Sequence, residues 1–112
     1  MQINVKMLEQ ITLVELAGDV DASTAPSVQD KVLPLVLSSN SKILLDMIKV
    51  PYMSSAGLRM LLSLFRQVTA KDGKLILVGL SEEISETMSI TGFLDFFKTC
   101  ETVEAGIEAL NQ

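Results

Sequence analysis

The chain has 112 residues, of which 48% are apolar, and a formal net charge of −5. That length is near the modal size of one domain, which argues against a two-domain enzyme with an interdomain cleft. The absence of histidine and the presence of a single cysteine, Cys100, exclude Ser-His-Asp and Cys-His triads, histidine-ligated zinc sites and an internal disulfide.

The first predicted elements are two strands that pair as an antiparallel ribbon. Ile3, Val5 and Met7 alternate with polar residues, which is typical of a half-buried strand. Residues 11–17 form the second strand, and Glu9-Gln10 is the tight connection between the two.

A loop and a helix follow the ribbon. Residues 18–21 form the loop, and Ser23 or Thr24 is expected to cap a helix with Pro26 in its first turn. Pro34 should kink this helix or end its regular hydrogen bonding early. Its apolar stripe is Val28, Val32 and Leu35.

Two buried strands flank the longest predicted helix. Residues 42–46 and 75–78 are apolar without alternation, as expected of central strands covered on both faces. Between them a helix runs from Ser55 to about Lys71, and Asp72-Gly73 ends it, with the glycine suited to the left-handed conformation. The apolar face of this helix is Leu58, Leu61, Leu62, Phe65 and Val68.

The last third of the chain predicts two short helices around an edge strand. Ser81 opens a helix that runs to about Thr91 and is closed by Gly92. Residues 96–99 form the edge strand, and Thr102 starts the last helix. The alternation predicts one α/β domain over residues 1–112, with a mixed sheet of about five strands and about four helices: an antiparallel N-terminal ribbon followed by parallel crossovers.

The segment that carries chemistry lies where a loop meets the start of the longest helix. Ser54 and Ser55 stand there, followed by Ala56 and Gly57. A helix N-terminus presents unpaired N–H groups and a partial positive charge, so a hydroxyl in this place either caps the helix or can accept phosphate. Spacing alone favours the capping interpretation.

The run Tyr52-Met53-Ser54-Ser55-Ala56-Gly57-Leu58-Arg59, preceded by Asp46 at the end of a buried strand, resembles the signature of the STAS-domain anti-sigma-factor antagonists. These are bacterial regulators of partner-switching pathways. Gly18-Asp19-Val20-Asp21 followed by Ala25-Pro26 is similar to the family's Gly-x-x-Asp loop, and the resemblance extends over essentially the whole chain. It implies the STAS fold.

The resemblance also implies a non-enzymatic function without cofactor or metal. Family members bind an anti-sigma factor that is also a serine kinase of the histidine-kinase-like ATPase fold, and binding releases the kinase's client. Phosphorylation of a motif serine separates the complex, and a PP2C-type serine phosphatase resets the antagonist. The phosphorylation site implied here is Ser55. Many relatives carry Asp at the position of Ser54 and Ser or Thr at that of Ala56, so Ser54 stays a second candidate.

The partner-binding surface implied by the resemblance is Asp21, Ser54, Ser55, Ala56, Gly57, Arg59 and Met60. Gly57 either lets a partner approach the backbone or meets a turn requirement. Arg59 falls on the helix face opposite the leucine stripe, and Met60 lies beside Arg59, outside that stripe. For Arg59, partner contact and a solvated face are both open. For Met60, partner contact and packing at the edge of the core are both open. Asp21 contacts the partner, orients the serine or forms an Asx turn. Asp46 is expected to brace the motif loop.

Two other functions compete with this hypothesis. The first is a STAS subunit that docks constitutively in a membrane lipid- or anion-transport assembly without phosphorylation. The second is a small hydrolase that uses Ser55, against which the lack of histidine and of an S-x-x-K arrangement argues.

We expect a cytoplasmic protein that neither enters a membrane nor binds nucleic acid. No apolar run approaches the roughly 20 residues that span a bilayer, and the N-terminus lacks the apolar core of a secretion signal. A pI near 4.6 and an aromatic content of 4% argue against nucleic acid as a partner.

Overall fold

The computed structural model describes residues 1–112 and confirms the predicted order of strands and helices. The strands are β1 (Gln2–Leu8), β2 (Ile11–Ala17), β3 (Lys42–Lys49), β4 (Lys74–Val78) and β5 (Lys98–Cys100). The α-helices are α1 (Ala25–Val36), α2 (Ser55–Ala70), α3 (Glu82–Ile90) and α4 (Val103–Leu110), and a 3-10 helix, η1, covers Phe93–Phe96.

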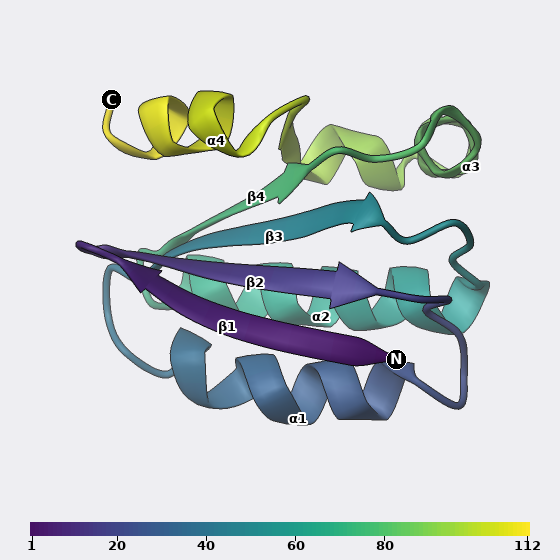
Figure 1. Cartoon of the computed structure of the whole chain (residues 1–112), viewed down its shortest axis with the longest axis horizontal. Helices are drawn as coiled ribbons and strands as arrows, with labels where there is room; N and C mark the ends of the chain where they lie inside the picture. The colour runs from purple at the N-terminus through teal and green to yellow at the C-terminus, as the bar shows by residue number, and fades with distance from the viewer.

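The five strands form one mixed sheet in the order β1-β2-β3-β4-β5. β1 and β2 pair antiparallel, and every other neighbouring pair is parallel. In Figure 1 the helices α1 and α2 lie against one face of the sheet, and α4 lies on the opposite face. The predicted α/β fold class, with its antiparallel ribbon at one end, is confirmed.

The two faces of the sheet carry separate apolar cores. The larger one joins the sheet to α1, α2 and α3, and it includes Ile43, Leu45 and Leu77 from the central strands and Ile84 and Met88 from α3. The smaller one lies under α4; its buried members are Ile11, Leu13, Leu44, Ile76, Val78 and Leu110. No polar or charged residue is buried, and no helix is long and apolar enough to cross a membrane.

The structure corrects two local predictions. Asp72, and not Gly73, adopts the left-handed conformation after α2, with φ of 59°. Gly73 is required for space instead, because a Cβ there would lie 2.9 Å from the carbonyl oxygen of Ser41. The edge strand predicted at residues 96–99 lies at Lys98–Cys100, because Phe96 belongs to η1, where its ring packs toward Phe65.

The N-terminal capping of α1 and the residues that it buries also differ from the prediction. Neither Ser23 nor Thr24 caps α1 through its side chain. The Ser23 hydroxyl donates to the Asp21 carboxylate at 2.7 Å, and the Thr24 hydroxyl donates to the carbonyl oxygen of Asp19 at 2.7 Å. The helix runs on past Pro34 to Val36, and Val36 is buried where Leu35 had been expected.

Candidate functional site

The loop before α2 is held by the loop before α1. The N–H of Ser54 donates to the carbonyl oxygen of Val20 at 2.9 Å, and the N–H of Val20 donates to that of Tyr52 at 3.0 Å. Val20 and Met53 form a parallel bridge that extends the β2–β3 pairing beyond the strand ends. Both side chains are buried, so hydrogen bonding and packing together fix where α2 begins.

Ser54 is the N-cap of α2. Its backbone is extended, with φ of −82° and ψ of 174°, and its Oγ accepts a hydrogen bond from the N–H of Gly57 at 3.3 Å. Its carbonyl oxygen accepts the N–H of Leu58 at 3.0 Å, which starts the helical ladder. The side chain of Ser54 therefore caps the N-terminus of α2.

Ser55 is the first residue of α2, and its side chain is exposed. Its hydroxyl takes part in no hydrogen bond within the chain, whereas the neighbouring Ser54 hydroxyl does. No acidic residue lies in the first turn of α2, so the partial positive charge of the helix N-terminus is not offset there by a carboxylate of the same helix. The setting suits an added anionic group on Ser55 better than one on Ser54.

Gly57 allows α2 to pack closely on the loop at residues 18–21. A Cβ at this position would lie 2.7 Å from Cγ of Met53 and 2.9 Å from both Cγ1 and the carbonyl oxygen of Val20. Gly57 has helical backbone and is buried, so neither a turn requirement nor the approach of a partner explains it. The close contact of two segments of the same chain does.

Asp21 follows Val20 and organises the start of α1. Its Oδ1 accepts hydrogen bonds from the Oγ and N–H of Ser23, at 2.7 and 2.9 Å, and from the N–H of Thr24 at 3.1 Å. These hydrogen bonds, led by that of the Ser23 hydroxyl, hold the pKa of Asp21 below its ordinary value. Of the roles left open for Asp21, the structure supports the Asx turn, and its carboxylate makes no hydrogen bond to Ser55.

The remaining predicted residues divide between surface and interior. Arg59 is exposed and Ala56 half-buried, and Arg59 makes no ion pair, since the one salt bridge in the structure joins Lys6 and Glu15. Met60 belongs to the larger core and is only 5% exposed, so its placement outside the apolar stripe is wrong.

The expectation for Asp46 also needs correction. β3 continues three residues beyond it, to Lys49, so Asp46 is not at the strand end. Its Oδ1 accepts the N–H of Ile48 at 3.0 Å within the same strand, and it does not brace the motif loop.

An exposed aromatic side chain beside the motif was missed by sequence reasoning. Tyr52 is 52% exposed and, with Met53 and Leu58, lines a small hollow of about 50 Å³ closed on the other side by Glu83, Ile84 and Thr87 of α3. The sequence does show an aromatic residue within the motif. The hollow could not be predicted from it, because α3, which forms the other wall, lies about 30 residues further along the chain.

The surroundings of the Ser55 hydroxyl are simple. No hydrogen bond joins the Ser55 hydroxyl to a group that could take its proton. No three His, Cys, Asp or Glu side chains converge so as to hold a metal ion. What the geometry offers is an exposed hydroxyl on a rigid helix end, beside an exposed tyrosine and an unpaired arginine.

The sequence of the chain is similar to those of a known protein family. The family model described as STAS domain matches residues 2–106. The anti-sigma-B factor antagonist of Bacillus subtilis (strain 168) is 30% identical over 106 residues, which cover 95% of this chain and 96% of that protein.

Two solved structures show the same fold. The anti-sigma factor antagonist from Mycobacterium paratuberculosis superimposes with a TM-score of 0.89 at 20% identity, covering 99% of this chain and 94% of that one. The Bacillus cell fate determinant SpoIIAA in its phosphorylated form gives a TM-score of 0.73 at 18% identity, covering 97% of this chain and 99% of that one.

Proposed function

Because the chain belongs to the STAS-domain family of anti-sigma-factor antagonists, we propose that it binds an anti-sigma factor that is also a serine kinase, and so releases that factor's client. The observation that carries the proposal is the exposed hydroxyl of Ser55, which makes no hydrogen bond within the chain and lies at the N-terminus of α2. In this role the chain catalyses no reaction and acts in the cytoplasm as one STAS domain over residues 1–112.

Phosphorylation of Ser55 is the off-switch in this proposal. Ser55 is favoured over Ser54 because the Ser54 hydroxyl already accepts the N–H of Gly57, and a phosphate there would displace the cap. On Ser55 the phosphate adds about −1.5 to −2 charges at pH 7, next to the positive end of the helix dipole. The fold tolerates that charge, so the switch acts at the interface and not through unfolding.

The interface effect is steric and electrostatic. A like-charge conflict across an interface costs several kcal/mol, on the order of a 1000-fold loss in affinity. That loss is sufficient to separate a complex. A PP2C-type phosphatase then restores the binding form by removing the phosphate. The phosphorylated relative of the same fold is consistent with a cycle of this kind.

The contact surface we propose is Ser54, Ser55, Ala56 and Arg59, with Asp21 and Tyr52 beside them. Gly57 and Met60 are buried and contribute by holding α2 in place. The loop at residues 18–21 enters the surface because its backbone pairs with that of Met53 and Ser54.

The test is to mix the chain with a cognate anti-sigma-factor kinase and Mg-ATP, and to follow the intact mass and the complex together. We expect the gain of one phosphate, its absence in Ser55→Ala and its presence in Ser54→Ala. We also expect Ser55→Asp to bind the kinase at least about 100-fold more weakly. A stable complex that gains no phosphate and binds Ser55→Asp equally well would instead support constitutive docking, as in a membrane transport assembly.

A further inference from the structure

The outer edge of β1 has no partner within the chain. β1 is the terminal strand in the sheet order β1-β2-β3-β4-β5, and only β2 pairs with it. Most of its side chains are exposed. The free edge of a sheet presents N–H and C=O groups that can pair with one more strand.

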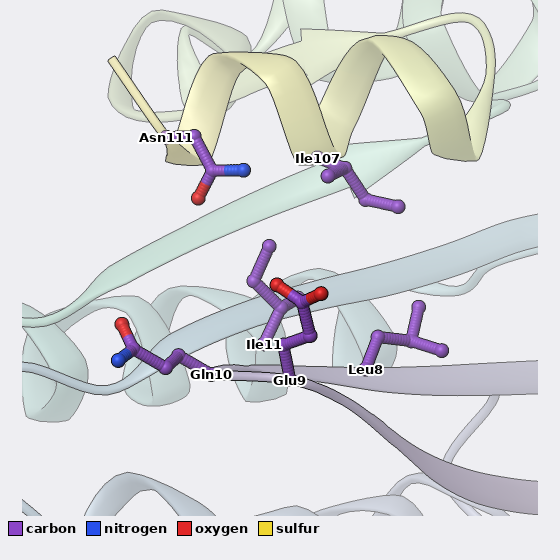
Figure 2. A pocket seen from close by; sticks show the side chains of 6 residues that line it. All are labelled: Leu8, Glu9, Gln10, Ile11, Ile107 and Asn111. Carbon is purple, nitrogen blue, oxygen red and sulfur yellow. The ribbon is translucent and has the colours of Figure 1, made fainter.

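The hairpin determines which backbone groups of β1 are free. Leu8 and Ile11 face each other across the two-residue turn Glu9-Gln10, as Figure 2 shows. Residues that flank such a turn exchange both of their backbone hydrogen bonds, and every second residue of an antiparallel pair does the same. Counting back from Leu8, the residues between these bonded ones point their N–H and C=O groups outward: Ile3, Val5 and Met7. No hydrogen bond in the chain uses these outward groups.

The same three residues carry exposed apolar side chains on one face of the strand. Figure 2 shows the Leu8 side chain directed toward α4, where it packs against the smaller core. Because side chains alternate along a strand, those of Ile3, Val5 and Met7 lie on the opposite face. Ile3 packs there against the larger core, whereas Val5 is 37% exposed and Met7 66% exposed. Free backbone groups and uncovered apolar surface therefore coincide.

This edge is complementary to a copy of itself. When two β1 strands lie antiparallel with Val5 opposite Val5, Ile3 of each copy lies opposite Met7 of the other. Every outward N–H and C=O group then has a partner, and apolar side chains face apolar side chains. On the other face of the strand, Asn4 lies opposite Lys6. Any other register leaves Ile3 or Met7 outside β1 of the second copy.

Lys6 does not block this pairing. It is the one charged residue of β1, and a lysine on an edge strand commonly hinders the approach of a second chain. Here its Nζ lies 3.1 Å from Oε1 of Glu15, so its charge is already paired within the chain. Its side chain lies on the face opposite that of Val5, and in this register it meets Asn4 and not a second lysine.

We propose that the chain forms a two-fold symmetric dimer through antiparallel pairing of two β1 strands, with Val5 of both copies at the axis. The occupant of the edge is a second copy because the free backbone groups and the side chains are symmetric about Val5. A short strand pair is smaller than a permanent interface, so we expect monomer and dimer to exchange over about 10 μM to 1 mM protein. β2 separates this edge from β3, which precedes Ser55, so the dimer does not rest on the proposed function.

The experiment combines sedimentation of the full chain over this concentration range with amide hydrogen exchange followed by NMR. We expect the average mass to rise from that of a monomer toward that of a dimer. We also expect the N–H groups of Val5 and Met7, which are open in the monomer, to exchange at least about fivefold more slowly in the concentrated sample.

Variants at Val5 test the symmetry of the contact. Val5→Lys and Val5→Glu each place like charges together at the axis and should weaken dimerisation at least about tenfold. An equimolar mixture of the two variants pairs opposite charges and should recover dimerisation to within about threefold of the unmodified chain. Val5→Pro removes the central outward N–H at an edge position that tolerates proline, and it should also weaken dimerisation at least about tenfold. The matched control, Ser89→Lys at an exposed position of α3, should dimerise like the unmodified chain.

Each of the opposite results would overturn the proposal. A chain that stays monomeric throughout the range leaves the edge free for an extended segment of another protein. Dimerisation that the Val5 variants do not weaken, or that leaves the exchange of the Val5 and Met7 N–H groups unchanged, uses another surface. A mixture of the lysine and glutamate variants that does not recover shows that Val5 does not face its own copy.

Discussion

Gly57 and Val20 touch across the base of the candidate site so closely that the glycine leaves no room for a methyl group. A Cβ on Gly57 would stand 2.9 Å from the carbonyl oxygen of Val20. That oxygen is not free to move, because it accepts the N–H of Ser54. The start of α2 and the loop before α1 therefore behave as one rigid unit beneath Ser55.

Gly57→Ala is expected to destabilise the fold by about 1–3 kcal/mol, the range for overpacking. Alanine by itself favours a helix by about 1 kcal/mol over glycine, so a destabilised variant shows that the contact with Val20 outweighs helix propensity. Urea denaturation measures the free energy of unfolding. Ser89→Ala, at an exposed position of α3, is the control and should be neutral or slightly stabilising. A stabilised Gly57→Ala would contradict the packing argument.

The two motif serines should differ in their effect on stability. Ser54→Ala removes the N-cap of α2 and is expected to cost about 1 kcal/mol. Ser55→Ala removes an exposed hydroxyl without hydrogen bonds and should stay within about 0.5 kcal/mol of the unmodified chain. Thermal unfolding of both variants checks this difference. Equal losses would mean that the hydroxyl of Ser55 has a structural role.

Asp21 should make the fold sensitive to acid. Its pKa is lowered in the folded chain, so its contribution is fully present above the unfolded value of 3.8 and is lost as the pH falls through the folded value. Unfolding measured between neutral pH and pH 3 should show a steeper acid loss for the unmodified chain than for Asp21→Asn. Asp30→Asn, at an exposed carboxylate without hydrogen bonds to the chain, is the control and should leave the slope unchanged.

Arg59 should pair with a phosphate on Ser55. The two residues are four apart on α2 and both are exposed, a spacing at which helical side chains meet. Phosphorylated chain is expected to gain about 0.3–1 kcal/mol of stability at low salt, and Arg59→Ala should reduce the gain. Arg66→Ala, further along the same helix, should not reduce it. Loss of stability on phosphorylation would instead implicate unfolding in the switch.

The failures of the sequence-based predictions share one cause. Met60 was placed outside the apolar stripe because that stripe was read as narrow, yet α2 contacts the sheet, α1 and η1 and buries a wider arc. Gly73 was expected to be left-handed, whereas Asp72 is, because only Gly73 fits against the carbonyl oxygen of Ser41. Each correction involves a neighbour that local patterning does not identify.

Local sequence determined the order of the strands and helices, the antiparallel ribbon and the position of two serines at the start of the longest helix. Periodicity, caps and chain breakers act over a few residues and can be read one segment at a time. Tertiary structure decided which of the two serines begins α2 as its cap, that Met60 is buried in the larger core, and that Gly57 packs against Val20. These features depend on contacts between segments far apart in the chain, such as Val20 with Met53, whose pairing no local pattern specifies.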